Sequence, residues 1–424
     1  MRIAKLFDSL LLLSKSPWRS LKWIPVCCRI RKKEGVTMTT LITNAKLITP
    51  NGIRENRNIL LSGKVIAGFP VDVVPADTVI DAEGAYVCPG FIDIHVHGGD
   101  GYEFIDATKE AVLAAANIHG KHGTTTIYPT LSAYSESDTC AAMDVIRDAA
   151  GEASLIPNIG GVHLEGPYFS VKQAGAQDPQ YIRDPDPEEY QRIIAAYGDL
   201  IRRWSYAPER SGAEDFQRCL AKHGIVGAAG HTDAEYDHMK VVFDLGCRLV
   251  THLYSGTSTI TRKGGFRHLG VIETAYLLDE MDVETIADGC HLPPLLLKLI
   301  YKLKGRERMC LITDAIRFGG RTDCGNVLSG TASVPYIIED GVAKLADRSA
   351  FAGSIATMDA LVRVCVQKTG IPLEDAVYMA TAVPARIMGL DRKGQLREGY
   401  DADLVMLDEQ LQVKNVFIGG EQRV

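Results

Sequence analysis

Two histidines, His95 and His97, lie two positions apart at the end of an apolar run, and two glycines follow them directly. If Phe91–His97 is a buried strand, both imidazoles point to the same side of it and can reach one ion. Imidazole is the commonest biological ligand for zinc and related metals. Strand histidines that bond only to the backbone have the same spacing, so this motif alone leaves metal binding and a structural role equally open.

The same arrangement, an apolar strand followed by an acid or a histidine, recurs downstream. Further candidates at predicted strand ends are Glu165, His231, His252, His291 and Asp314. At least five of the 11 histidines therefore fall at strand ends, a placement not expected of scattered core histidines. A carboxylate with imidazoles suits a borderline divalent ion, zinc or ferrous iron, which acidifies water and polarises a carbonyl. Asp314, alone at the last strand end, can shuttle the proton. The set predicts a metal-dependent hydrolase of an amide or related bond.

The remaining histidines are expected to have structural roles. His163 shares the face of Glu165 but lies one step deeper, so at most it supports a ligand from behind. The others are expected in helices, in loops or on the surface: His119, His122, His223, His238 and His268.

These residues need a scaffold that brings strand ends together. Predicted strands alternate with segments long enough for crossover helices, which indicates βα units and a parallel sheet. The eight candidates are Phe91–His97, Thr124–Pro129, Ile159–Leu164, Ile201–Ala207, Ile225–Gly230, Arg248–Leu253, Val283–Asp288 and Met309–Thr313. Eight units predict a (β/α)₈ TIM barrel over residues 89–390, whose active site lies at the carboxyl ends of the strands.

Both ends of the chain have a different character. Residues 38–88 contain short alternating strands separated by turns, and residues 391–424 repeat this pattern. The two segments are predicted to form one small composite β-sandwich. The predicted strands are Leu41–Ile48, Asn58–Ser62, Lys64–Gly68, Val79–Val87, Gly394–Leu396, Ala402–Met406 and Val413–Ile418. Within the barrel, Gly319–Ala350 is predicted to be an excursion near its mouth, with a hairpin at Tyr336–Leu345.

Residues 1–37 match neither a signal peptide nor the first strand of the sandwich. No stretch of the chain reaches the roughly 18 apolar residues of a membrane span. We expect translation to begin at Met38 and the preceding residues to have no function. The formal net charge of −7 gives no basic surface for nucleic acid. The ten cysteines include no C-x-x-C pair, which favours reduced thiols and a cytoplasmic protein.

From Met38 to its end, the chain resembles the amidohydrolase superfamily and, within it, the N-acetylglucosamine-6-phosphate deacetylase family. The matching segments are Pro89–Gly99, His163–Tyr168, Gly230–Asp233, His252–Tyr254, Ile286–His291, Thr313–Ala315, Ala352–Ser354 and Gly399–Val405. The resemblance implies a (β/α)₈ barrel with a composite β-sandwich, usually in a homodimer. It also implies removal of acetate from an N-acetylhexosamine 6-phosphate in amino-sugar catabolism, most readily N-acetylglucosamine 6-phosphate.

By similarity to this family, Glu165, His231 and His252 would hold the main divalent ion. His95 and His97 would hold a second ion bridged by Glu165. Some members lack the histidine pair and use one metal, so the resemblance allows one or two ions per chain.

The resemblance also implies roles for the substrate-binding residues. Asp314 would act as the general base and then as the acid for the leaving amine, and His291 would contact the sugar. Arg267 would bind the phosphate, although the loop before it departs from the family pattern and contains Arg262 and Lys263 as rival cations.

Two further positions concern the choice of sugar. Ser255-Gly256 stands where the family usually has Asn-Ala beside the phosphate. Gln177 stands where some members have a histidine near the acetyl carbonyl and others a glutamine. These departures leave room for a related substrate such as N-acetylgalactosamine 6-phosphate.

Two other function classes are weighed against this one. Cyclic-amide hydrolases of the superfamily bridge two metals with a modified lysine, but no lysine ends a predicted strand and Glu165 takes that place. A non-catalytic scaffold descended from such an enzyme would be expected to have lost ligands, and this chain has lost none.

Overall fold

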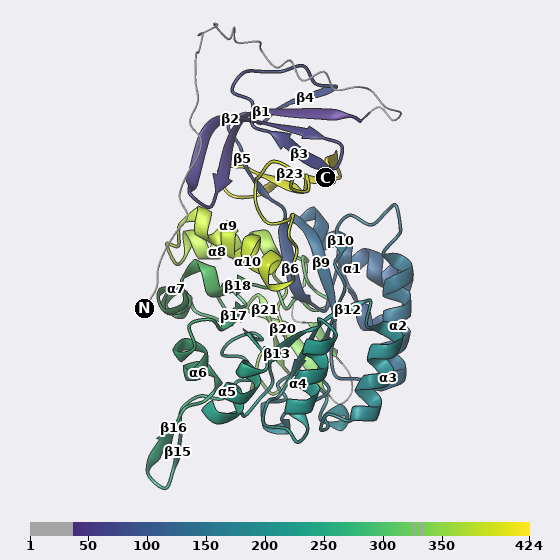
Figure 1. The fold of residues 1–424 in the computed structure, drawn as a ribbon, viewed down its shortest axis with the longest axis vertical. Coiled ribbons are helices and arrows are strands. Elements are labelled where there is room, and N and C mark those ends of the chain that lie inside the picture. The colour runs from purple at the N-terminus through teal and green to yellow at the C-terminus, as the bar shows by residue number, and fades with distance from the viewer. Residues whose placement is uncertain (1–36, 325–326, 331–333) are drawn as a thin grey trace, which may run out of the picture. The chain divides into compact units, whose positions relative to one another are not determined.

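A parallel sheet curls into a barrel in the computed structural model, which describes residues 37–324, 327–330 and 334–424 (Figure 1). Its strands are β6 (Phe91–Val96), β9 (Thr124–Leu131), β11 (Val162–Glu165), β12 (Ile201–Tyr206), β13 (Val226–Ala229), β14 (Leu249–Val250), β17 (Asp282–Thr285) and β18 (Met309–Leu311). Backbone hydrogen bonds join the first and last strand segments, from Asp314 N to His95 O (2.9 Å) and from His97 N to Ala315 O (2.8 Å). The predicted (β/α)₈ fold is confirmed.

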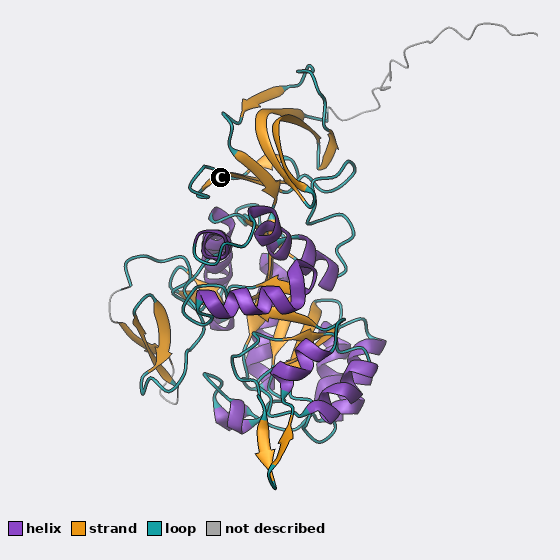
Figure 2. Cartoon of the chain, turned by 90° about the vertical axis from the view of Figure 1, so that its left-hand side faces the viewer, coloured by secondary structure: helices purple, strands orange, loops and turns teal. Residues whose placement is uncertain are grey.

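Helices follow most barrel strands and cover their outer faces (Figure 2). They are α1 (Lys109–Lys121), α2 (Glu136–Ala149), α3 (Pro187–Tyr197), α4 (Ala213–Lys222), α5 (Tyr236–Asp244), α6 (Val271–Leu277), α7 (Pro294–Arg308), α8 (Met358–Gln367), α9 (Leu373–Ala380) and α10 (Ala382–Ile387). Because helices cover one face and the barrel interior covers the other, β9 is buried along its whole length. Of the described helices, none has the length and apolar content that a membrane crossing needs.

The second sheet combines strands from both ends of the described chain. It contains β1 (Thr39–Thr49), β2 (Gly52–Ser62), β3 (Val65–Gly68), β4 (Thr78–Asp81), β5 (Tyr86–Pro89), β22 (Leu404–Leu407), β23 (Val413–Ile418) and β24 (Glu421–Gln422). The pairing of β22 with β5 joins the two ends. The division of the chain after residues 88 and 390 stays a prediction. The predicted extension, residues 1–37, lies outside the described residues except for Thr37.

Two strand predictions for this sheet are wrong. Val79–Val87 is not one strand, because Glu83 and Gly84 adopt positive φ angles of 54° and 77° and turn the chain between β4 and β5. Asp81 stabilises this turn, since its Oδ1 accepts a hydrogen bond from Glu83 N at 2.8 Å. Gly394–Leu396 forms no strand.

Two insertions extend from the barrel. The antiparallel strands β19 (Val327–Gly330), β20 (Pro335–Glu339) and β21 (Val342–Leu345) form a small separate sheet, visible in Figure 2. It includes the predicted hairpin, and Tyr336 on β20 lines a cavity together with His97 and Asp314. The hairpin of β15 (Thr261–Lys263) and β16 (Phe266–His268) projects away from the barrel (Figure 1).

Candidate active site

Three of the predicted ligands meet where β6 and β11 end. The Nε2 atom of His97 lies 3.2 Å from Oε2 of Glu165, and Nε2 of His95 lies 3.4 Å from Oε1. The two imidazole Nε2 atoms are themselves 3.3 Å apart. The side chains at i and i+2 therefore face one point, as the strand spacing predicts.

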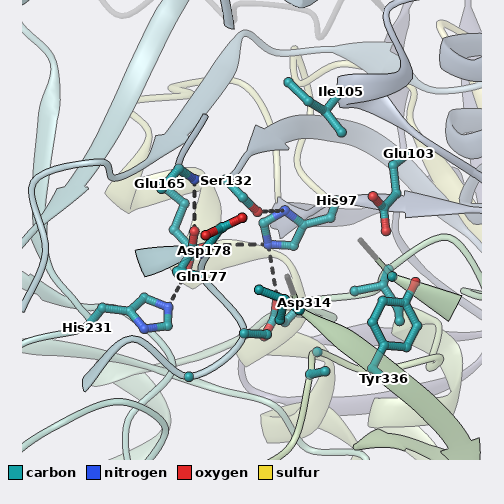
Figure 3. A pocket seen from close by; sticks show the side chains of 18 of the residues that line it. His97, Glu103, Ile105, Ser132, Glu165, Gln177, Asp178, His231, Asp314 and Tyr336 are labelled. Carbon is teal, nitrogen blue, oxygen red and sulfur yellow. Dashed lines mark hydrogen bonds and ion pairs between the residues drawn. The ribbon is translucent and has the colours of Figure 1, made fainter. Parts of the chain in front are cut away.

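Two more histidines lie close to the same carboxylate. The Nε2 atoms of His231 and His252 lie 3.2 and 2.9 Å from Oε1 of Glu165. Figure 3 shows Glu165 between His97 and His231. Glu165 is 1% exposed, so its charge has to be balanced by the groups around it. The structure thus brings all five predicted metal ligands together.

Three of the site residues adopt a backbone conformation that is rare for residues other than glycine. The φ angles are 44° at His231, 28° at His252 and 48° at Asp314. Such conformations cost about 1–3 kcal/mol each and persist where the surroundings enforce them. Here the sharp turn after each strand aims the side chain inward, over the barrel.

The hydrogen bonds of the outer ring nitrogens determine which atoms face the cluster. Nδ1 of His231 lies 2.8 Å from the carbonyl of Gln173, and Nδ1 of His252 lies 3.0 Å from the carbonyl of Ser255. A carbonyl oxygen can only accept, so Nδ1 carries the proton in both rings. The Nε2 lone pairs are then free to bind a metal, as is usual for metal-ligating histidine.

The electrostatics of the cluster favour a cation. Burial lowers the pKa of His95 and His97, but the carboxylates of Glu165 and Asp314 outweigh it and raise the two values to about 9 and about 10. Burial raises the pKa of Asp314, and the surrounding imidazoles, with His252 among them, lower it to about 2. Two ionised carboxylates in a buried cluster require positive charge nearby, which a divalent ion can supply.

The donor atoms also lie close enough to share ions. Ligand atoms lie within 4.8 Å of one another in three groups: His95 with His97 and Glu165, His95 with His252 and Asp314, and Glu165 with His231 and His252. Imidazole and carboxylate donors of this kind suit zinc or ferrous iron. The residues present therefore fit a divalent metal.

A cavity of about 770 Å³ opens onto this cluster (Figure 3). The cluster residues that line it are His97, Glu165, His231, His252 and Asp314. Of the predicted substrate-binding residues, it is lined by Gln177, Ser255, Gly256 and His291. No lysine lies among the described lining residues, so this part of the chain offers no counterpart to a bridging modified lysine.

Gln177 and His291 are both held in a single orientation. The Nε2 amide of Gln177 donates to Oε2 of Glu165 at 2.7 Å, while its Oε1 accepts from Ala133 N at 2.8 Å. One amide hydrogen of Gln177 remains for another acceptor. Nδ1 of His291 donates to Oδ2 of Asp288 at 2.7 Å, which leaves Nε2 of His291 as an acceptor.

Gly256 has a structural reason to be glycine. Its φ angle is +52°, and a Cβ atom there would lie 2.9 Å from Nδ1 of His231 and 3.0 Å from the carbonyl oxygen of Gln173. An alanine at this position would press on the hydrogen bond that orients His231. The Ser255-Gly256 pair is therefore coupled to the position of a ligand.

Arg267 does not line the cavity. It lies on the projecting hairpin, is exposed, and donates from Nη1 to the carbonyl of Gly265 at 3.3 Å. Its neighbour Lys263 pairs with Glu235 at 2.6 Å. Among the described lining residues, Arg317 is the one arginine or lysine, and it is paired with acids of its own. The predicted phosphate contact of Arg267 stays a prediction.

Sequence reasoning missed several residues that support the ligands. Ser132 lies 3.1 Å from Nδ1 of His97, and Glu284 lies 3.3 Å from Nδ1 of His95. Arg203 forms a buried ion pair with Glu284. His163 lies behind the candidate ligand His95, with 4.7 Å between ring centroids, a position that suits a supporting residue. A charged residue inside a predicted strand, as at Glu284 and Arg203, was the signal available in the sequence.

The model of the Amidohydrolase family matches residues 86–423. The chain belongs to this family. Over 388 residues it is 32% identical to N-acetylglucosamine-6-phosphate deacetylase of Lysinibacillus sphaericus, covering 91% of this chain and 98% of the relative. It is 29% identical to N-acetylgalactosamine-6-phosphate deacetylase of Escherichia coli O157:H7, and this match covers 91% of this chain and 99% of the relative.

A solved structure agrees with this assignment. It is a mutant of N-acetyl-D-glucosamine-6-phosphate deacetylase from Mycobacterium smegmatis in complex with N-acetyl-D-glucosamine-6-phosphate. Its TM-score with this chain is 0.82 at 32% identity, over 91% of this chain and 99% of that one. The predictions of an amidohydrolase and of an enzyme are confirmed.

Proposed function

We propose that this chain removes acetate from an N-acetylhexosamine 6-phosphate, with N-acetylglucosamine 6-phosphate as its preferred substrate. The observation that carries the proposal is the convergence of four histidines on Glu165 beside Asp314, on a cavity with Gln177 and His291 in fixed orientations. The proposal is further supported by relatives that act on these two sugar phosphates. The products would be the amino-sugar phosphate and acetate.

Glu165, His231 and His252 would hold a divalent ion, zinc or iron, and His95 with His97 would hold a second. When bound, such an ion polarises a carbonyl and acidifies water. The Nδ1 hydrogen bonds to the carbonyls of Gln173 and Ser255 keep the lone pairs of two ligands directed at the cluster.

The remaining steps fall to side chains of the chain. Asp314 has an ionised carboxylate 3.2 Å from Nε2 of His97, where it can take a proton from the attacking water and return it to the leaving amine. Gln177 can donate its unused amide hydrogen to the acetyl carbonyl. His291, with Nε2 as an acceptor, can bind a sugar hydroxyl.

The experiment is a comparison of acetate release from N-acetylglucosamine 6-phosphate and from the unphosphorylated sugar by the purified, metal-loaded protein. We expect turnover of the phosphorylated sugar with a much larger kcat/KM. No acetate from any N-acetylhexosamine 6-phosphate, in a protein shown to contain metal, would exclude the proposal.

N-acetylgalactosamine 6-phosphate is the second candidate, and the observation in its favour is Ser255-Gly256. Ser255 lines the cavity with a short hydroxyl where the family resemblance leads us to expect an asparagine, which leaves space for a differently shaped sugar. A kcat/KM that is higher for the galacto epimer than for the gluco epimer would assign the enzyme to this second substrate.

We also propose a cytoplasmic homodimer. The eight cysteines in the described residues are all free thiols, in keeping with a reducing compartment. Light scattering on the purified protein would test the dimer: a mass of one chain at micromolar concentration would exclude it.

A further inference from the structure

A buried ion pair lies inside the barrel beside the metal-ligand cluster. Arg203 of β12 and Glu284 of β17 contact each other, and both side chains are 0% exposed. Barrel interiors are usually filled with branched aliphatic side chains. Taking a pair of charges out of water costs several kcal/mol per ion, so burial of such a pair is weak evidence for a stabilising role. The contacts of the pair indicate another role.

Glu284 connects the two halves of the ligand cluster. Its Oε2 atom lies 3.3 Å from Nδ1 of His95 and accepts a hydrogen bond from the backbone N–H of His252 at 3.2 Å. One carboxylate oxygen thus contacts a ligand side chain from β6 and the backbone of a ligand that follows β14. A carboxylate only accepts, so the proton of neutral His95 lies on Nδ1 and the Nε2 lone pair faces Glu165.

Arg203 bonds to the same two segments, at the residues that precede His95 and His252. Its Nη1 atom donates to the carbonyl of Ile94 at 3.0 Å, and its Nη2 atom donates to Oγ1 of Thr251 at 3.0 Å. These two residues directly precede His95 and His252. Glu284 therefore contacts His95 and His252 directly, and Arg203 contacts the residue that precedes each of them.

We propose that Glu284 is a positioning residue that sets the ring orientation of His95, and that Arg203 aims the Glu284 carboxylate. The inference rests on the proposed function, because it assumes that the cluster holds metal. Its consequence is selective: the ion bound by His95 and His97 depends on the Arg203–Glu284 pair. The ion bound through His231 and His252 depends on the pair much less, since the carbonyls of Gln173 and Ser255 orient both rings and Glu284 contacts only the backbone N–H of His252.

The test is a titration of the metal-depleted full chain with Zn²⁺ by calorimetry, for the wild type and Glu284→Gln. Loss of a carboxylate behind a metal-ligating histidine typically costs 10–100-fold in affinity. We expect the weaker of two Zn²⁺ sites, which we assign to His95 and His97, to lose affinity in that range. The affinity of the other site should stay within about threefold of the wild type. Equal affinities in both proteins, or one Zn²⁺ site in the wild type, would overturn the inference.

Asp282→Asn is the matched control. Asp282 is a buried carboxylate on the same strand, two residues before Glu284, and it pairs with Arg386 at 2.7 Å, away from the ligands. We expect this variant to lose thermal stability while both Zn²⁺ affinities are retained. A loss of the weaker site here as well would mean that any damage to β17 releases the ion, and the positioning role would be rejected.

Two further measurements cover the case in which Glu284→Gln leaves Arg203 unpaired and fails to fold. The double variant Arg203→Gln/Glu284→Gln removes both buried charges and is expected to lose the same Zn²⁺ site. In ¹⁵N-histidine-labelled, Zn²⁺-loaded wild type, His95 should carry its proton on Nδ1, and a proton on Nε2 would contradict the proposal. Acetate release by the wild type is measured separately. Its absence would contradict the proposed function, whereas Zn²⁺ binding that is unchanged in the variants would contradict this inference.

Discussion

Replacing Asp314 by asparagine isolates the proton-transfer role that the site predicts. Asparagine has nearly the same shape, and it tolerates the left-handed backbone that Asp314 adopts at φ 48°. The backbone hydrogen bonds to His95 O (2.9 Å) and from Ser354 N (2.8 Å) involve main-chain atoms and survive the change. The substitution therefore removes a charge and a proton acceptor and little else.

The expected loss is a loss of kcat, because the substitution removes only the charge and the proton acceptor. General acid–base help is worth about 10²–10⁴-fold, or about 2.7–5.4 kcal/mol at 1.36 kcal/mol for each tenfold change. Asp314 also lies 3.2 Å from His97 and 3.4 Å from His95, so metal content has to be measured in the same sample. The assay is steady-state acetate release from N-acetylglucosamine 6-phosphate, combined with elemental analysis.

Asp403→Asn is the control, because Asp403 has the same 8% exposure but pairs with Lys393, outside the cavity lining. We expect it to keep kcat within about threefold of wild type. A kcat of Asp314→Asn within threefold of wild type at normal metal content would refute the proton-transfer role. Loss of metal with loss of activity would instead make Asp314 a ligand.

Three further outcomes are expected. Dialysis against a chelator should abolish acetate release and lower the thermal unfolding midpoint, because the two buried carboxylates of the cluster lose their countercharge; added Zn²⁺ should restore both, and full activity of metal-free protein would contradict the site. Arg267→Ala should lower kcat/KM for the phosphorylated sugar by a factor that corresponds to several kcal/mol, about the scale of a lost charge-assisted contact. The kcat/KM for the unphosphorylated sugar should hardly change. Equal losses on both sugars would assign Arg267 to the fold. A chain that starts at Met38 should match the full chain in kcat and in unfolding midpoint, and a clear drop in either would give residues 1–37 a role.

The convergence of the candidate metal ligands could be predicted from the sequence because chain order and strand periodicity determine where they lie. In a barrel of successive βα units, every strand ends on the same face. A histidine or acid at the end of an apolar run is therefore close to the other strand ends, however far apart they are along the chain. Glu165 and His252, 87 residues apart, contact each other at 2.9 Å for this reason.

The substrate side of the site was less predictable because it depends on loops. Arg267 was chosen by motif, yet its position is determined by the β15–β16 hairpin, which carries it away from the cavity lining. The turn at Glu83-Gly84 was missed for a related reason. A non-glycine residue at positive φ, such as Glu83, leaves little trace in composition, and together with Gly84 it divides an apparently continuous strand.

The residues that orient the candidate ligands could not be predicted from the sequence, and the reason is physical. β12 contains Arg202 and Arg203 in succession, and a shift of one residue in register would exchange the exposed and the buried arginine. The sequence does not state which arginine faces the interior. The structure does, because Arg203 is buried where Glu284 can pair with it. A ligand can be recognised from its own chemistry, whereas a supporting residue is defined by what it contacts, and those contacts depend on register. Hypotheses about metal affinity in this family therefore need the interior register of the barrel as well as its ligand motifs.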